Sequence, residues 1–280
     1  QVPLELHREG LDRLVVDYLD IWTRQPILDR WREIVDRIQR SHKRVTVGVV
    51  GKYIDLVDAY KSLHEALHHG GLAHRVKVDL RYIDSEEIEE RGSECLLDGV
   101  DAILVPGGFG QRGVEGKITA IQYAREEKIP FFGICLGLQL AVIEYARHMA
   151  GISQATSVEF APETHAPLIN LMETQKNVNT IGGTMRLGAY PCLLVEDSKA
   201  HQIYGTLEIS ERHRHRYEVN NDYRERLIEA GLIISGASPN SELVEMIELS
   251  DHPWFVATQA HPEFKSKPYQ AHPLFKSFIL

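Results

Sequence analysis

The stretch Ile129-Pro-Phe-Phe-Gly-Ile-Cys-Leu-Gly-Leu-Gln139 decides how this chain folds. A short apolar run leads to Cys135, which Gly133 and Gly137 flank, and residues that favour a helix follow. This is a cysteine version of the strand-turn-helix nucleophile elbow, in which flanking glycines permit a sharp turn and expose the nucleophile. The pattern therefore predicts a buried strand over 129–134 and a helix over 136–150, with Cys135 at the bend.

Upstream of this stretch, short β-branched runs alternate with amphipathic segments. They predict strands at 45–50, 76–83 and 102–105 and helices at 59–69, 85–90 and 115–126. Such alternation indicates an α/β domain with a mostly parallel central sheet and helices on both faces, where ligands bind beyond the carboxyl ends of the strands. Downstream, short runs at 182–187, 213–219, 232–235, 243–249 and 254–259 predict a small antiparallel addition.

Residues 1–43 differ in character from the remainder, because they are highly charged and carry apolar residues at helical spacing. Two amphipathic helices separated near Pro26 are expected there. We divide the chain into a helical interdomain linker, 1–43, and a catalytic domain, 44–280. The chain opens on Gln1 without an initiator Met, so a preceding N-terminal portion is expected.

Composition excludes several classes of function. A net charge of −9 disfavours nucleic acid as a partner, because a polyanion would be repelled. No apolar run reaches the roughly 20 residues that a membrane span needs, and no secretory signal opens the chain, which points to a cytoplasmic protein without a membrane partner. The three cysteines lack CxxC spacing, so neither a disulfide framework nor a metal site is expected.

Cys135 is the candidate nucleophile. A thiol at a helix N-terminus meets exposed N–H groups and the positive end of the helix dipole, and both favour the thiolate. A small buried cysteine that happens to precede a helix is the alternative, and it is the better interpretation for a lone cysteine. The two glycines, the strand before and the helix after reverse that preference. Cys95 and Cys192 have no such setting and are interpreted as structural.

A thiolate nucleophile needs a proton shuttle, and His261-Pro-Glu263 supplies one. In an extended segment residues i and i+2 point to the same side, so Glu263 can hold one imidazole nitrogen while the other faces the thiol. Most other histidines are interpreted as surface residues. This motif has little weight alone and gains it from the elbow.

Attack on an amide carbonyl forms an oxyanion, which preorganised N–H donors stabilise. Pro106-Gly-Gly-Phe-Gly110 follows a predicted buried strand, so the N–H groups of Gly108 and Leu136 are the predicted donors. The same loop matches G-x-G-x-x-G over 108–113, which raises a dinucleotide-binding alternative. It is disfavoured because the next strand ends in the cysteine elbow, where an acidic residue for the ribose would be required.

A basic run, 212–217, alternates arginine with histidine. In an extended segment Arg212, Arg214 and Arg216 share one face and the histidines the other. Most of these side chains are interpreted as a solvated surface, although one guanidinium could clamp the carboxylate of a small substrate bidentately.

Taken together, Gly-Gly-Phe-Gly at 107–110, Gly-Ile-Cys-Leu-Gly-Leu-Gln at 133–139 and His-Pro-Glu at 261–263 resemble the class I glutamine amidotransferases. Gly-Lys-Tyr at 51–53, Asp-Ala-Tyr-Lys-Ser at 58–62, Gly-Gly-Thr-Met-Arg-Leu-Gly at 182–188 and Glu-Arg-His-Arg-His-Arg-Tyr-Glu-Val-Asn at 211–220 narrow the resemblance to the C-terminal half of the CTP synthase family. The resemblance covers nearly the whole chain, including the leading linker.

The resemblance implies a flavodoxin-like amidotransferase fold that hydrolyses L-glutamine through Cys135, His261 and Glu263. It implies that ammonia passes to a synthase domain, absent here, where ATP and Mg²⁺ support amination of UTP to CTP, and that the full-length enzyme is a homotetramer. GTP would act as an allosteric activator through a mobile segment over 110–116. The implied glutamine-binding residues are Gly108, Leu136, Gly137, Leu138, Gln139, Glu159 and Arg216, and the implied regulatory residues are Arg112, Gly113 and Glu115.

Three alternatives stay open from the sequence. The chain could be a different class I amidotransferase or a γ-glutamyl hydrolase on the same scaffold. It could also be a catalytically silent scaffold that only binds nucleotide or assembles filaments. The resemblance implies no cofactor and no metal in this half of the enzyme.

Overall fold

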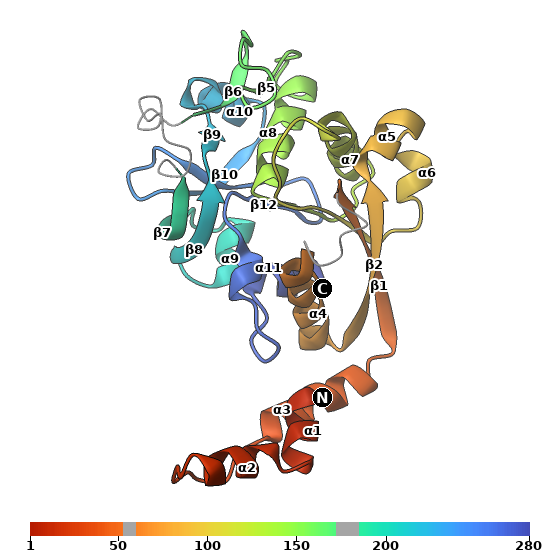
Figure 1. The fold of residues 1–280 in the computed structure, drawn as a ribbon. Coiled ribbons are helices and arrows are strands. Elements are labelled where there is room, and N and C mark those ends of the chain that lie inside the picture. Colours follow the sequence, from red (N-terminus) through yellow and green to blue (C-terminus); the bar gives the residue numbers. More distant parts are fainter. Residues whose placement is uncertain (53–59, 172–184) are drawn as a thin grey trace.

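Two sheets organise the computed structural model, which describes residues 1–52, 60–171 and 185–280 (Figure 1). Within this part of the chain, the larger sheet has nine strands in the order β2-β1-β3-β4-β12-β11-β10-β7-β8, and the smaller has the order β5-β6-β9. The strands are β1 Lys43–Gly51, β2 Val76–Asp84, β3 Ala102–Val105, β4 Phe131–Ile134, β5 Thr156–Ser157, β6 Pro167–Leu171, β7 Arg186–Leu194, β8 Glu208–His215, β9 Tyr217–Val219, β10 Ile233–Ala237, β11 Val244–Glu248 and β12 Phe255–Thr258.

The larger sheet is parallel at one end and antiparallel at the other. From β2 to β12 each neighbouring pair is parallel, and from β12 to β8 each pair is antiparallel. The carboxyl ends of β3, β4 and β12 therefore lie at one edge, and this edge is where an α/β sheet binds its ligands.

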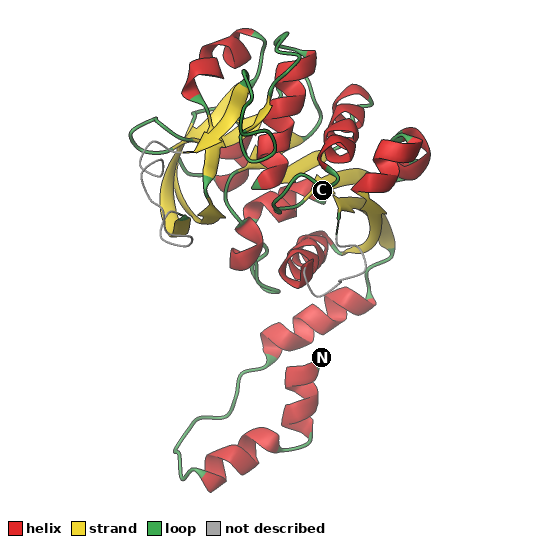
Figure 2. Cartoon of the chain, turned by 45° about the horizontal axis from the view of Figure 1, so that its top comes forward, coloured by secondary structure: helices red, strands yellow, loops and turns green. Residues whose placement is uncertain are grey.

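Both faces of the larger sheet are covered because successive residues of a buried strand point in opposite directions. In β4, Phe131 packs into the core with α7 and α8, whereas Phe132 packs on the other face with α4 and α11. Figure 2 shows the strands lying between helices. The helices of this region are α4 Lys61–His74, α5 Ser85–Arg91, α6 Glu94–Leu97, α7 Val114–Glu126, α8 Leu136–His148, α9 Lys199–Tyr204, α10 Arg224–Glu229 and α11 Pro273–Phe278, with 3-10 turns η3 Asn221–Tyr223 and η4 Pro262–Lys265.

The first 42 residues form three helices, α1 Val2–Arg8, α2 Leu11–Tyr18 and α3 Asp29–Gln39, which extend from the start of β1 to one side of the sheet (Figure 1). The two helices predicted on either side of Pro26 are confirmed as α2 and α3, whereas α1 was not predicted as a separate helix. Gly10 adopts a left-handed conformation (φ 79°) and separates α1 from α2. Among these helices Ile34 is the buried residue, and it lies near α4. The domain boundary at residue 43 stays a prediction.

The predicted α/β class and the mostly parallel half of the sheet are confirmed, and the antiparallel half is larger than the small addition that was predicted. The prediction of one strand over 213–219 was wrong, since β8 and β9 belong to different sheets and Arg216 lies between them. The predicted starts of a helix at residue 59 and a strand at 182 lie outside the described residues.

None of the helices described by the structure combines the length and the apolar character that crossing a lipid bilayer requires.

Candidate active site

Cys135 stands at the bend between β4 and α8, as the sequence predicted. Its backbone has φ 52° and ψ −101°, a conformation that is rare and strained for a residue with a side chain. The N–H of Cys135 donates to the carbonyl of Thr258 at 2.7 Å, which ties the bend to the end of β12. The strained backbone is typical of a nucleophile elbow and directs the thiol away from the sheet.

The two flanking glycines act by allowing close packing, since neither has a left-handed backbone. A Cβ on Gly137 would lie 2.2 Å from the carbonyl oxygen of Val105, and one on Gly133 would lie 2.8 Å from the Cβ of Ala257. Any larger residue would therefore push α8 away from β3, or β4 away from β12.

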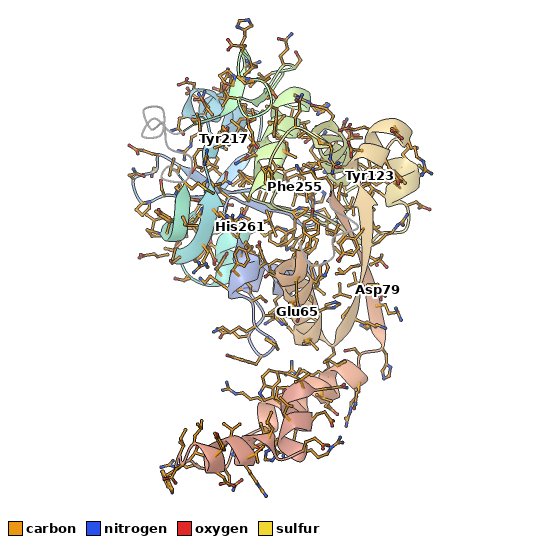
Figure 3. The ribbon with its side chains drawn as sticks, viewed as in Figure 1. Glu65, Asp79, Tyr123, Tyr217, Phe255 and His261 are labelled. Carbon is orange, nitrogen blue, oxygen red and sulfur yellow. The ribbon has the colours of Figure 1, made fainter. Side chains whose placement is uncertain are left out.

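His261 lies at the carboxyl edge of the sheet, beside β8, where its N–H donates to the carbonyl of Arg212 at 2.7 Å (Figure 3). Its Nδ1 lies 2.8 Å from Oε1 of Glu263. The predicted contact is present, but the prediction that an extended segment makes it was wrong. His261 caps η4, and the 3-10 turn brings Glu263 back toward the ring.

The His261 ring also lies within hydrogen-bonding reach of the Cys135 thiol. Burial lowers the pKa of His261, but the hydrogen bonds and charges of Cys135 and Glu263 outweigh that effect and raise the pKa to about 10. The imidazole is thus linked to both the candidate nucleophile and a carboxylate, so the imidazolium form of His261 is favoured at neutral pH.

Gly107 packs against both reactive side chains. A Cβ at this position would lie 2.7 Å from Cε1 of His261 and 3.5 Å from the Cβ of Cys135. This contact could not be read from the sequence, because it joins three segments that are distant along the chain.

Replacing Gly107 with alanine is expected to lower kcat about 100-fold, since displacing a catalytic group by 1 Å has an effect of that order. The added methyl must push the imidazole away from the thiol. Gly236→Ala is the matched control, because its new Cβ would lie 2.9 Å from Sγ of Cys192, outside this site. If steady-state kinetics gave both variants the same kcat, the steric role of Gly107 would be wrong.

The predicted oxyanion donors lie side by side. Gly108 is close enough to α8 that a Cβ on it would lie 3.4 Å from Cδ2 of Leu136. Leu136 is the first residue of α8, where backbone N–H groups have no partner inside the helix. The use of both N–H groups as oxyanion donors stays a prediction.

The Gln139 side chain joins two parts of the site, and its predicted contact with glutamine stays a prediction. Its side-chain Nε2 lies 3.0 Å from the carbonyl of Tyr217 and 3.2 Å from Oε1 of Gln259. Gln259 in turn donates to Sγ of Cys135 at 3.6 Å. Gln259 was not predicted as a site residue, and its place just after β12 and two residues before His261 was the available signal.

Gly137 and Leu138, which were also predicted to contact glutamine, are buried in the first turn of α8. The Leu138 side chain belongs to the core, and its N–H donates to the carbonyl of Cys135 at 3.1 Å. Gly137 has no side chain and packs against β3, so a contact of either residue with glutamine would come from its backbone and stays a prediction.

Glu159 and Arg216 are both close enough to Tyr217 to act on it electrostatically. Glu159 accepts a hydrogen bond from the N–H of Gly110 at 2.7 Å, and burial raises the pKa of Glu159. Burial and the Glu159 carboxylate raise the pKa of Tyr217, whereas Arg216 opposes this rise, so both charges act on the same phenol. Figure 3 marks Tyr217 near β9. Its carbonyl accepts from Gln139, so Glu159 and Arg216 lie on the side of the site where Gln139 is located.

The three predicted regulatory residues lie where the loop after β3 leads into α7. Arg112 donates to the carbonyl of Lys52 at 3.0 Å and lies 3.4 Å from Glu86. Glu115 forms an ion pair with Arg147 at 2.7 Å. Gly113 precedes α7, and a Cβ on it would lie 2.1 Å from Oγ of Ser85, so movement of this half of the segment requires α5 or α7 to shift.

A cavity of about 210 Å³ opens behind the histidine, and its lining includes Tyr60, Pro106, Gly107, His261 and Glu263. Within the residues that the structure describes, no three His, Cys, Asp or Glu side chains come together in a way that could hold a metal ion.

Comparison with known protein sequences gives three similarities. A family model described as class-I glutamine amidotransferase matches residues 55–280. The chain is 59% identical over 279 residues to the CTP synthase of Geotalea uraniireducens (strain Rf4), and the match covers 99% of this chain and 52% of that protein. The CTP synthase of Desulfotalea psychrophila is 56% identical over 290 residues, with 100% of this chain and 53% of that protein covered. The chain therefore spans about half the length of these relatives.

Among solved structures, the chain is similar to the glutaminase domain of a Trypanosoma brucei CTP synthase, solved with bound acivicin. The TM-score is 0.79 at 42% sequence identity, and the match covers 84% of this chain and 92% of that one.

Proposed function

This chain belongs to the class-I glutamine amidotransferase family, and within it to the glutaminase domains of CTP synthases, and on that premise we propose that it hydrolyses L-glutamine and supplies ammonia to a synthase half. The observation that carries the proposal is the position of His261, which lies within hydrogen-bonding reach of Cys135 on one side and bonds to Glu263 at 2.8 Å on the other. This is the arrangement that nucleophilic catalysis by a thiol requires.

In the first half of the reaction, the Cys135 thiolate attacks the carboxamide carbon of glutamine. The N–H groups of Gly108 and Leu136 stabilise the oxyanion that forms. The His261 imidazolium gives its proton to the departing nitrogen, the carbon–nitrogen bond breaks, and ammonia leaves a γ-glutamyl thioester on Cys135.

In the second half, neutral His261 takes a proton from a water molecule, and the resulting hydroxide attacks the thioester carbonyl. The same two N–H groups stabilise the second oxyanion, which collapses as the carbon–sulfur bond breaks. Glutamate leaves, and the thiolate and imidazolium are restored. Glu263 holds the Nδ1 proton throughout and keeps Nε2 directed at the sulfur.

Substrate binding is assigned to the charges near Tyr217. Arg216 would pair with the α-carboxylate of glutamine, because a guanidinium can bind a carboxylate through two parallel hydrogen bonds. Glu159 would accept from the α-ammonium group, although in the present structure it accepts from the N–H of Gly110. Arg216 and Glu159 carry opposite charges, as binding of the α-carboxylate and the α-ammonium group of one amino acid requires.

The ammonia is proposed to aminate UTP in an ATP-dependent synthase half, as the names and lengths of the relatives support. GTP is proposed to activate hydrolysis through the segment that holds Arg112, Gly113 and Glu115. We also propose that the full-length enzyme is a homotetramer and that it is located in the cytoplasm.

Release of ammonia from L-glutamine by this chain tests the function directly. Glutamate and ammonia are measured in equal amounts, first with the chain alone and then with a synthase half from a relative, ATP, Mg²⁺, UTP and GTP. We expect glutamine hydrolysis in both cases and CTP only in the second. Cleavage of γ-glutamyl peptides at the same rate as glutamine would instead indicate a γ-glutamyl hydrolase.

Replacing Glu263 with glutamine is expected to lower the pKa of His261 and so to destabilise its imidazolium form. The pKa of His261 is raised to about 10 partly by this carboxylate, so its loss lowers that pKa, and a neighbouring charge accounts for about 1–3 pH units. Protonation of the leaving nitrogen requires the acid form, and the basic limb of the kcat/KM profile should move to lower pH by that amount. A profile that stays in place would contradict the orienting role of Glu263.

A further inference from the structure

A buried arginine links the two parts of the site. Arg186, near the start of β7, is 6% exposed. Its Nη1 lies 3.1 Å from Oε1 of Glu218, and its Nη2 lies 2.7 Å from Oε1 of Glu245. The guanidinium also lies over the ring of Tyr190, at 4.6 Å from the ring centroid. The mechanism above makes no use of this cluster.

The two carboxylates come from segments that carry the proposed chemistry. Glu218 lies in β9, two residues after Arg216. Glu245 lies in β11, and its backbone carbonyl accepts from the N–H of Gln259 at 2.9 Å. Gln259 donates to the Cys135 thiol. Arg186 therefore connects the segment that holds Arg216 with the segment that supports the nucleophile.

Arg216 itself lies at a break in the secondary structure. β8 ends at His215 and β9 begins at Tyr217, in a different sheet. Arg186 is paired with His215 in the ladder of β7 and β8, so its backbone fixes the residue before Arg216. Its side chain binds Glu218, which lies two residues after Arg216. The position of Arg216 thus depends on a contact between the two sheets.

Two histidines complete the cluster without adding charge. His213 and His215 lie 2.9 Å apart, from Nδ1 to Nε2, and Nδ1 of His215 lies 3.2 Å from the carbonyl of Tyr217. Burial, and then the charge of Arg186, lower the pKa of His213 to about 2 and that of His215 to about 3. Both rings are neutral at physiological pH, so in the part of the chain that the structure describes Arg186 is the cation that contacts Glu218 and Glu245.

We propose that Arg186 is a positioning residue for substrate binding, which sets the place of Arg216 relative to the Cys135 thiol by bridging Glu218 and Glu245. The proposal rests on the proposed function, in which Arg216 binds the α-carboxylate of glutamine. An arginine suits this task because its planar fork reaches two carboxylates at once, whereas the ammonium of a lysine is a single point of charge.

The test compares Arg186→Met and Arg186→Lys with Arg125→Met, all in a Cys95→Ser background that removes the exposed thiol. Arg125 is the matched control, because it forms a buried ion pair with Glu144 at 2.8 Å between α7 and α8, outside the site. Arg186→Met can fold because burial, with the charge of Glu245, raises the pKa of Glu218 to about 8 against the opposing effect of Arg186. That carboxyl can therefore stay protonated when the cation is lost, so no uncompensated charge is left at Glu218.

Two readouts separate positioning from stability. The first is steady-state hydrolysis, where both Arg186 variants should raise KM for glutamine about 10-fold or more, as loss of a charged hydrogen bond does, with a much smaller change in kcat. The second is alkylation of Cys135. A chloroketone analogue of glutamine, which carries an α-carboxylate, should react about 10-fold more slowly, whereas iodoacetamide, which lacks one, should react at the wild-type rate.

Arg125→Met should lower thermal stability and leave KM and both alkylation rates unchanged. The proposal is overturned if the Arg186 variants keep the wild-type KM, if they slow both reagents equally, or if neither variant yields folded protein, since that last result would make Arg186 a residue of global folding. Failure of the proposed function looks different, because the unmodified chain would then release no ammonia and Cys135 would not react with the chloroketone.

Discussion

Replacing Cys135 with serine is expected to lower kcat for glutamine hydrolysis by at least about 10⁴-fold, the scale on which loss of a member of a catalytic triad acts. A serine hydroxyl is not ionised by the neighbouring imidazole, so the imidazolium and thiolate pair proposed for the mechanism cannot form. The nucleophile and the proton donor are then lost in one substitution. Ammonia release, followed in a continuous coupled assay, gives the rate.

Cys95→Ser is the control for this variant, because Cys95 is exposed and lies outside the site. It should keep the wild-type kcat. Cys135→Ser with more than about one hundredth of wild-type kcat would contradict a nucleophilic role, since the oxyanion donors alone contribute far less than the thiol.

His261→Asn is expected to lower kcat by about 10³- to 10⁴-fold, as loss of a general base in a triad does. Asparagine can still donate to Glu263 but can neither give a proton to the departing nitrogen nor take one from water. Both halves of the reaction therefore slow. KM should change little, because the proposed contacts to the α-carboxylate lie at Arg216.

A second buried histidine serves as the matched control. His252 is 3% exposed, and its Nε2 lies 3.0 Å from the carbonyl of Ala124, away from the thiol. His252→Asn should lose stability and keep kcat within about 3-fold, since it touches no reacting group. If His261→Asn behaved in the same way as His252→Asn, the triad would be wrong.

Local sequence signals predicted the elements around the nucleophile well. The strand before Cys135 and the helix after it were found because apolar runs of four to six residues, glycines and helix formers all lie within one short segment. The same holds for β3, whose predicted bounds, 102–105, match the structure. Each of these signals acts over a few residues.

Contacts between distant segments were harder to predict. Gln259 reaches the Cys135 thiol because β12 pairs in parallel with β4, although more than a hundred residues separate them. Periodicity shows that both are buried strands but carries no information about their register. The steric role of Gly107 was missed for the same reason, because its neighbours are His261 and Cys135.

The break at Arg216 has a different origin. Alternating arginines and histidines read as one strand over 213–219, and the predicted division of faces holds in β8, where Arg212 and Arg214 are exposed and His213 and His215 are buried. The chain leaves the larger sheet at Arg216 because Tyr217, Glu218 and Val219 pair with β6. Which strand a segment pairs with depends on tertiary contacts, and local propensity does not encode it.

The central claim is that folding brings one imidazole to one thiol and activates it, and the most direct test is to map where a glutamine chloroketone reacts. The chain contains three cysteines that differ in setting: Cys95 is exposed, and burial, with Glu245 and Glu211, raises the pKa of Cys192 to about 12. Peptide mapping by mass spectrometry should place a single label on Cys135, and excess L-glutamine should prevent it. A label on Cys95 or Cys192, or labelling of Cys135 that glutamine does not slow, would contradict the account.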